Sequence, residues 1–174
     1  PYDSGFAFVK DPLAHRRAMD ITASYLVAGA DDGRHPTHYG PELSRRARGF
    51  VVWAVLQGLG KKGVRDMVAH HCHCAQFLEQ RLSKVEGINI LNHVVLNQLA
   101  ISFGDDDSIS VRDALTAKVI ARIRAENKNF VLGASWKDQH ILRVSIISQL
   151  TEIADMEVLA TSIIKAWKAV RALA

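Results

Sequence analysis

The sequence has few prolines, few aromatic residues and only two cysteines, and each scarcity excludes a class of protein. With 4 prolines and 11 glycines among 174 residues, the chain is neither collagen-like nor of low complexity. Cys72 and Cys74 lie too close in sequence to cross-link a fold, a usage typical of the reducing cytoplasm. No apolar run approaches the roughly 18 residues that a membrane-spanning helix needs, so we expect a cytoplasmic protein without a membrane partner.

The sequence also lacks a strong excess of one charge. Lysine and arginine total 22 against 18 aspartates and glutamates, and 48% of the residues are hydrophobic, as in ordinary globular proteins. The one dense basic run is Arg45, Arg46 and Arg48, and no aromatic residues alternate with it. We therefore expect no nucleic-acid binding. We interpret the run as charge at a helix start that pairs with acidic groups, the alternative being an anionic ligand.

The first half of the chain predicts a strand over residues 5–10 and a short helix that begins at residue 12. An exposed loop is predicted over 27–41, and two longer helices over 44–60 and 62–84. Asp11 can cap the short helix because Pro12 is well tolerated at the first helical position. Ser44 can cap the next helix in the same way. A strand over 5–10 has no partner nearby, so we expect its partners in chain upstream of Pro1, which is not a start methionine.

The second half alternates differently, as strand, strand, helix, strand, strand, helix. Short runs rich in isoleucine, leucine and valine predict the strands, and apolar residues at three- and four-residue spacing predict the helices. The predicted elements are 88–92, 98–103, 111–123, 130–136, 141–148 and 153–173. This order is typical of a small α+β domain whose mainly antiparallel sheet is covered by helices.

Three blocks of residues carry a resemblance to a known family. They are Pro1-Tyr2-Asp3-Ser4-Gly5-Phe6-Ala7-Phe8-Val9-Lys10-Asp11-Pro12, then Pro41-Glu42-Leu43-Ser44-Arg45-Arg46-Ala47-Arg48-Gly49-Phe50, then Ser135-Trp136, Leu142-Arg143-Val144-Ser145 and Thr151-Glu152. In this order they resemble the group II pyridoxal-phosphate-dependent amino-acid decarboxylases, which include the aromatic amino-acid, histidine and glutamate decarboxylases. The resemblance covers essentially the whole chain but only the C-terminal portion of the family.

The resemblance implies an α/β fold of the aminotransferase-like fold type I. Residues 1–84 would then be the end of the large cofactor domain, with a mobile loop and connecting helices, and 85–174 the C-terminal α+β small domain. In the family a lysine in a His-Lys-Trp pattern holds the cofactor just before the segment that matches Pro1. That pattern is absent here. We therefore expect a chain cut just after the catalytic lysine and inactive alone.

The function implied is that of a decarboxylase that uses pyridoxal 5'-phosphate to release CO2 from an amino acid, aromatic or similar. The family's active site forms at a homodimer interface, so we expect a homodimer with a small-molecule substrate. Two alternatives stay open: a non-catalytic dimerisation or interaction fragment, and a related carbon–carbon lyase that uses the same cofactor.

The resemblance implies three site residues. The family's loop tyrosine, implicated in protonating the α-carbon, corresponds to Tyr39, with Tyr25, His35 and His38 as alternatives in the same region, and a phenol is a reasonable proton donor. Ser44 matches a substrate-pocket position, although a helix cap alone would also explain it.

Arg143 resembles the small-domain arginine that faces the substrate carboxylate. The fork of a guanidinium suits a carboxylate, and an arginine buried in an apolar strand would need such an anion. The alternative is an arginine on a solvent-facing side of the strand, shared with Ser145 and Ile147.

The cluster His70-His71-Cys72-His73-Cys74 raises the question of a metal. On a helix, His70, His73 and Cys74 share one face, but a structural zinc site needs a fourth ligand. We therefore expect no metal site, and we place His71 on the apolar side of the helix. We expect two tryptophans to belong to the core rather than to a cofactor site, Trp136 and Trp167.

Overall fold

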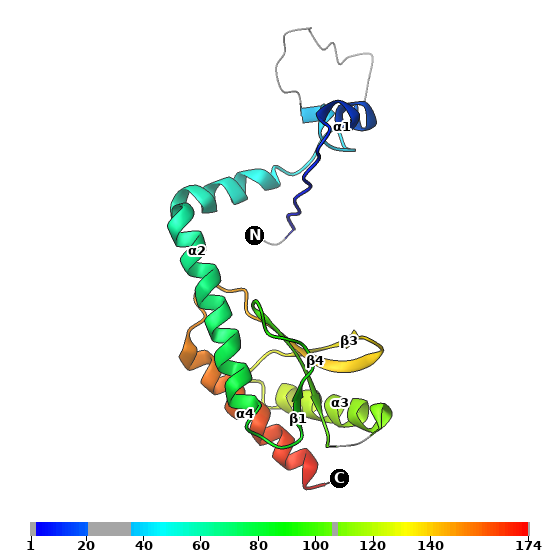
Figure 1. Ribbon diagram of the computed structural model, residues 1–174, viewed down its shortest axis with the longest axis vertical. Coiled ribbons are helices and arrows are strands. Elements are labelled where there is room, and N and C mark those ends of the chain that lie inside the picture. Colours follow the sequence, from blue (N-terminus) through cyan, green and yellow to red (C-terminus); the bar gives the residue numbers. More distant parts are fainter. Residues whose placement is uncertain (1–2, 21–35, 106–107, 174) are drawn as a thin grey trace. The chain divides into compact units, whose positions relative to one another are not determined.

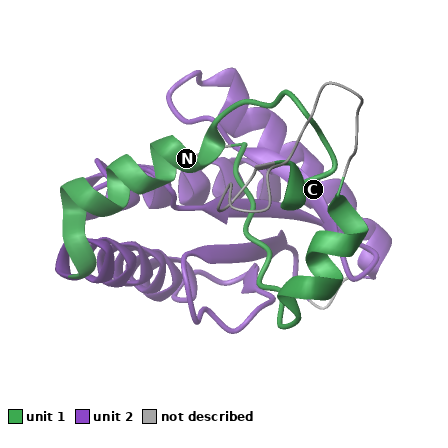
Figure 2. Ribbon diagram, turned by 90° about the horizontal axis from the view of Figure 1, so that it is seen from above, with its two compact units in different colours: residues 1–61 green, residues 62–174 purple. Residues whose placement is uncertain are grey.

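The computed structural model describes residues 3–20, 36–105 and 108–173 (Figure 1). The chain divides into two compact units, Pro1–Lys61 and Lys62–Ala174 (Figure 2). Tyr25 and His35, two of the alternatives to Tyr39, lie outside the described residues. No helix within the described ranges is both long enough and apolar enough to cross a membrane.

The first unit contains helix α1 (Pro12–Met19), the short 3-10 helix η1 (Pro36–His38) and the beginning of α2 (Arg48–Leu82). Asp11 caps α1 as predicted, because its Oδ1 accepts hydrogen bonds from the Leu13 and Ala14 amides at 2.9 and 3.0 Å. Residues 5–10 form no strand within the described chain, and the strand predicted there, with partners upstream of Pro1, stays a prediction. A strand exists only through hydrogen bonds to a neighbour, and these residues pair with no strand in the described chain.

Helix α2 starts at Arg48, so the prediction that Ser44 caps it is wrong. Ser44 lies in a bend four positions earlier. In that bend Arg45 donates a hydrogen bond from Nη1 to the Glu42 carbonyl at 2.8 Å, which holds this segment in a turn of its own before the helix begins.

The predicted break between two helices is confirmed at Gly60. Helix α2 covers Arg48 to Leu82, but Gly60 has φ 63° and ψ 177°, outside the helical region, so α2 consists of two helical segments that meet at a kink. A positive φ is accessible to glycine without a steric cost, which is why the break falls on this residue. The second half of α2 buries one face, made of His71, Cys74, Ala75, Leu78 and Leu82.

The second unit contains all six predicted elements. They are β1 (Ile88–Ile90), β2 (Gln98–Phe103), α3 (Ile109–Ala125), β3 (Leu132–Trp136), β4 (Gln139–Ser145) and α4 (Ile153–Arg171). The sheet is antiparallel throughout, in the order β1-β2-β4-β3. Lys137 and Asp138 both have positive φ, 50° and 59°, so a tight two-residue turn joins β3 to β4 and pairs Trp136 with Gln139.

The core of this unit lies between one face of the sheet and the helices. Helix α3 packs against β2, β4 and α4 (Figure 1). The strands contribute alternate residues to the core, namely Leu99, Ile101 and Phe103 of β2 with Leu142 and Val144 of β4. Trp167 lies in this core as predicted, 2% exposed, and its Nε1 donates to the Glu86 carbonyl at 2.8 Å.

Candidate functional site

The structure brings two of the three predicted site residues together. Tyr39 and Ser44 line one open hollow of about 810 Å³ in the first unit. Around them the hollow is lined by the start of α2 and the residues before it, which include the arginine run Arg45, Arg46 and Arg48. Two hydroxyl groups and three guanidinium groups therefore surround one space, at the end of a helix where backbone amides also point outward.

The arginine run pairs with an acidic group, as predicted. The Asp3 carboxylate lies 3.0 Å from Nε of Arg48 and 3.6 Å from Nη1 of Arg46. The guanidinium of Arg45 donates from Nη1 to the Glu42 carbonyl at 2.8 Å and lies close to Gly40, where an added Cβ would be only 2.6 Å from Nη1. The donors are thus arranged for an anion, with one carboxylate already close to two of them.

Tyr39 lies among imidazoles. Its ring is 5.8 Å from the His15 ring in an edge-on arrangement and 6.3 Å from the His38 ring, between centroids. His38 is only 6% exposed, and its Nε2 lies 3.6 Å from the Asp20 carboxylate. His38 is therefore a packed residue beside Tyr39 rather than a solvated loop histidine. The Tyr39 side chain keeps 40% of its surface exposed, so it is accessible from the hollow.

Arg143 lies in the second unit, in the middle of β4, and its side chain is exposed. Its cross-strand neighbours, Ala100 on β2 and Leu132 on β3, are on the sheet face opposite the helices. The expectation of a buried arginine is wrong, because strand alternation directs Leu142 and Val144 into the core and Arg143 away from it. In the described parts of the chain no carboxylate pairs with this guanidinium.

Two hollows adjoin Arg143. The smaller, about 130 Å³, lies on the open face of the sheet, and Trp136 forms one of its walls. Trp136 is therefore only partly buried, unlike the core residue expected from the sequence. The larger, about 280 Å³, lies where the pairing of β3 with β4 ends at Leu132 and Arg143. Its walls are largely apolar, with Phe130, Met156 and Leu159 among them.

The histidine and cysteine cluster on α2 contacts backbone rather than forming a ligand set. His70 Nε2 lies 2.7 Å from the Thr151 carbonyl oxygen, and His71 Nε2 lies 2.9 Å from that of Ser148. No three histidine, cysteine or acidic side chains in the described ranges are grouped as a metal site would require. Both cysteines are free thiols. Sequence reasoning missed these contacts, which join residues 77 and 81 positions apart and leave no local signal.

No family model matches the chain. Curated relatives do match it: the phenylacetaldehyde synthase of a Rosa hybrid cultivar is 23% identical over 94% of this chain and 33% of the relative. The histidine decarboxylase of Drosophila melanogaster is 24% identical over 99% of this chain and 19% of the relative. Among solved structures, tryptophan decarboxylase of Catharanthus roseus superposes with a TM-score of 0.68 at 14% identity, over 77% of this chain and 28% of that chain.

The chain is similar to part of a pyridoxal-phosphate-dependent amino-acid decarboxylase. The resemblance drawn from the three sequence blocks is thereby confirmed, and so is the fold expected from it. The chain spans only 19% to 33% of the length of these curated relatives.

Proposed function

We propose that this chain is the C-terminal part of a cytoplasmic, homodimeric decarboxylase that uses pyridoxal 5'-phosphate to release CO2 from an aromatic or similar amino acid. The observation that carries the proposal is the hollow at the start of α2. Tyr39 and Ser44 were singled out separately by the resemblance, and they line the same space. The names of the relatives, histidine decarboxylase and tryptophan decarboxylase among them, support the same reaction.

The residues of the hollow fit an anionic group such as the phosphate of the cofactor or a carboxylate of the substrate. Three guanidinium groups and two hydroxyl groups supply the donors, and the Asp3 carboxylate is the acidic group that already lies against two of them. No lysine is among the described residues that line it, so the lysine that binds the cofactor covalently has to come from outside this hollow.

When bound, pyridoxal phosphate would supply an acceptor for the electron pair of the breaking bond to the carboxylate. Three residues of this chain contribute to the proposed reaction. The Tyr39 hydroxyl delivers a proton to the α-carbon, the Ser44 hydroxyl accepts or donates a hydrogen bond at the substrate side chain, and Arg143 holds the carboxylate. Residues 1–84 complete the cofactor domain and 85–174 form the small domain.

The test uses the intact enzyme that contains this chain, assayed against a panel of amino acids for CO2 and amine. Tyr39→Phe should lower kcat by about 100-fold or more if its hydroxyl supplies the proton, with little change in KM. Tyr25→Phe is the matched control, because it removes the same hydroxyl from the alternative tyrosine. Full activity of Tyr39→Phe together with loss of activity in Tyr25→Phe would assign the proton transfer to Tyr25. If the intact enzyme formed amine from none of the amino acids tested, the decarboxylase proposal would be refuted.

Aldehyde formation is the second candidate, because one relative is a phenylacetaldehyde synthase and one structural neighbour a 4-hydroxyphenylacetaldehyde synthase. The same assay separates the two reactions when aldehyde is measured beside amine. Amine as the main product favours decarboxylation with protonation by Tyr39, and aldehyde as the main product favours the synthase.

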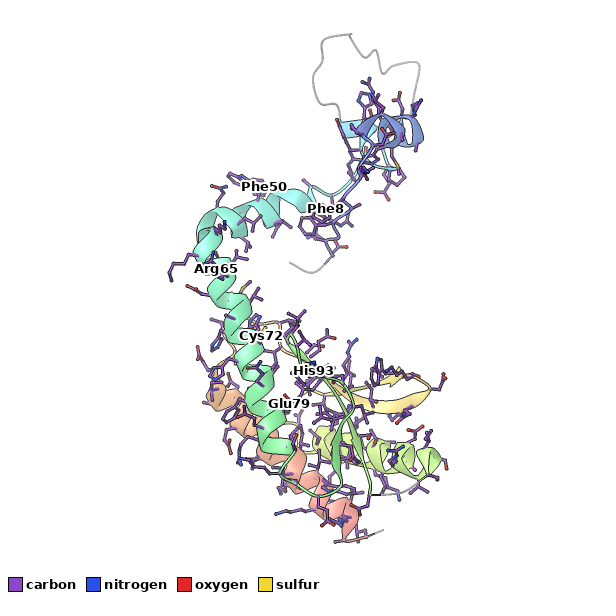
Figure 3. All side chains as sticks on the ribbon, viewed as in Figure 1. Phe8, Phe50, Arg65, Cys72, Glu79 and His93 are labelled. Carbon is purple, nitrogen blue, oxygen red and sulfur yellow. The ribbon has the colours of Figure 1, made fainter. Side chains whose placement is uncertain are left out.

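A non-catalytic dimerisation or interaction fragment is a further candidate, beside the related carbon–carbon lyase. Large apolar side chains exposed in the first unit support it, since they are typical of a surface that a partner covers (Figure 3). Borohydride reduction after addition of pyridoxal phosphate discriminates: a covalent adduct on the intact protein favours the enzyme, and a translation start immediately before Pro1 favours the fragment.

A further inference from the structure

Two neighbouring histidines of α2 reach the same short stretch of backbone, the segment between β4 and α4 (residues 148–151). His70 Nε2 lies 2.7 Å from the Thr151 carbonyl oxygen, and His71 Nε2 lies 2.9 Å from the Ser148 carbonyl oxygen. His71 is 7% exposed and lies on the buried face of α2. Neither side chain has a role in the proposed reaction.

The atoms around Nε2 of His70 and Nε2 of His71 decide which nitrogen of each ring carries the hydrogen. A carbonyl oxygen only accepts, so a nitrogen at 2.7 or 2.9 Å from it has to donate. A Glu152 carboxylate oxygen lies 3.8 Å from Nε2 of His70 and also favours an N–H there. Both imidazoles therefore carry hydrogen on Nε2.

Few contacts within the segment anchor it, although the residues on either side are held: Ile146 is buried and its backbone forms two hydrogen bonds with Asn97, and Glu152 belongs to the capping box of α4. Leu150 is 84% exposed, and Ile147 just before the segment is 59% exposed, so few apolar contacts hold it. Its internal hydrogen bonds run only from the Thr151 amide to the Ser148 carbonyl, at 3.1 Å, and from the Leu150 amide to the Ser148 hydroxyl, at 3.2 Å. The two histidines supply the contacts that tie it to α2.

The segment also forms part of a wall. Ser148 and Thr151 both line the 280 Å³ hollow that adjoins Arg143. We propose that His70 and His71 are positioning residues, which donate from Nε2 to the backbone of residues 148–151 and thereby fix the wall of this hollow. We call these two hydrogen bonds, from His70 and His71 to the backbone of residues 148–151, the histidine clasp. The clasp does not depend on the reaction, whereas its effect on substrate binding rests on the proposed function.

The first test is the hydrogen position. Long-range 1H–15N NMR of the 174-residue chain, at a pH where imidazoles are neutral, distinguishes Nε2–H from Nδ1–H for each histidine. We expect His70 and His71 to show the Nε2–H pattern. A dominant Nδ1–H form at either residue overturns the inference for that residue, because its Nε2 could then no longer donate.

The second test separates the donor from the packing. His71→Gln retains an N–H at the position that Nε2 reaches, whereas His71→Leu retains apolar bulk and removes the donor. We expect amide hydrogen exchange at Thr151 to be at least tenfold faster in the leucine variant and within about threefold of the parent in the glutamine variant. His73→Leu is the control, since His73 is exposed on the same helix. Equal exchange in His71→Leu and His71→Gln overturns the proposal.

The third measurement links the clasp to the site. In the intact enzyme, His71→Leu should raise KM severalfold with a smaller change in kcat, and His71→Gln should restore KM. A failure of the exchange test refutes the clasp whatever the enzyme does. Altered exchange with an unchanged KM refutes only the link to the substrate, and an intact protein without decarboxylase activity refutes the proposed function while the clasp stands.

Discussion

Cys72 and Cys74 are two positions apart on α2, yet only Cys74 is fully buried. Burial raises the pKa of the Cys74 thiol, and the carboxylates of Glu152 and Asp155 raise it further. Because the thiolate is the reactive form, we expect iodoacetamide at pH 8 to label Cys74 about tenfold or more slowly than Cys72. Mass spectrometry of the peptides over time measures both rates. Labelling in guanidinium chloride is the control, where the two rates should converge, and equal rates in the folded chain would contradict the assigned burial.

Gly87 connects α2 to β1 in a conformation that a larger residue does not adopt easily. Its φ is 77°, and an added Cβ would lie 2.4 Å from the Trp167 ring. We expect Gly87→Ala to lower the free energy of unfolding by about 2 to 4 kcal/mol, from backbone strain and from displacement of the core tryptophan. Denaturant titration followed by tryptophan fluorescence measures it.

Gly58 provides the comparison for that substitution. It lies inside helix α2, and an added Cβ meets no atom within 4 Å. Gly58→Ala should therefore change stability by less than about 1 kcal/mol, toward a more stable helix. Similar losses at both glycines would show that the Trp167 contact is not the cause.

At the scale of elements, an arginine–glutamate pair joins α2 to α4. Arg81 Nε donates to Glu157 at 2.8 Å, and Nη2 donates to the other carboxylate oxygen. The hydrogen bonds from Arg81 lower the pKa of Glu157 below its ordinary value. A lowered carboxylate pKa stabilises the folded chain above the unfolded value of about 4.3, and this contribution is lost as the pH falls through the folded pKa.

Glu157→Gln should accordingly be less stable than the parent at pH 7, and the difference should shrink as the pH falls below the ordinary glutamate pKa of about 4.3 and through the lowered pKa of Glu157. The side chains of Arg81 and Glu157 are 39% and 43% exposed, so we expect a small effect that about 0.5 M salt weakens. Melting curves across pH measure it. Glu79→Gln is the control, because Glu79 lies on α2 two positions before Arg81 and has no ion pair in the described residues. A difference that persists at low pH would assign the loss to something other than the charge.

The six elements from Ile88 to Arg171 could be predicted because their signals are local. Apolar residues at period two or 3.6 reflect which side of each element is buried, whatever it packs against. The strand over 5–10 stays a prediction, because a strand forms only with a hydrogen-bonded partner and the described chain contains none for it. The start of α2 failed because Ser44 is a good cap by type, while the Arg45 contact with Glu42 holds that stretch in a bend.

The candidate site was predictable only in part. The resemblance named Tyr39, Ser44 and Arg143, and the first two do share a hollow. The helical spacing of the histidines and cysteines raised the question of a metal site. The contacts that His70 and His71 actually make run to backbone carbonyls far along the chain. No local pattern encodes a bond from a side chain to a distant carbonyl, so such positioning contacts emerge only from the folded structure.

At the scale of the whole molecule, the two units bury very different amounts of apolar surface. Every core residue of the described chain, from Cys74 to Val170, belongs to the second unit. In the described part of the first unit the only buried side chains are Thr37 and His38. Its large apolar side chains are exposed instead, Phe8 by 96% and Phe50 by 67% among them (Figure 3). Since burial of apolar surface is the main stabilising term, the first unit should open far more readily than the second.

Limited trypsin digestion of the isolated chain tests this difference. Lys61 and Lys62 are exposed beside the break at Gly60, so we expect cleavage there and in the first unit, leaving a resistant fragment from about Lys62 to the C-terminus. Lys118 is the internal comparison, since it is also exposed but lies on α3 in the second unit. Proteases cut a chain that opens locally, so cleavage after Lys61 should be at least about tenfold faster than after Lys118. Comparable rates at the two sites, or survival of residues 1–61, would mean that the first unit is stabilised by contacts beyond its own core. The same digestion of the intact enzyme should protect Lys61, because the exposed apolar side chains are then covered.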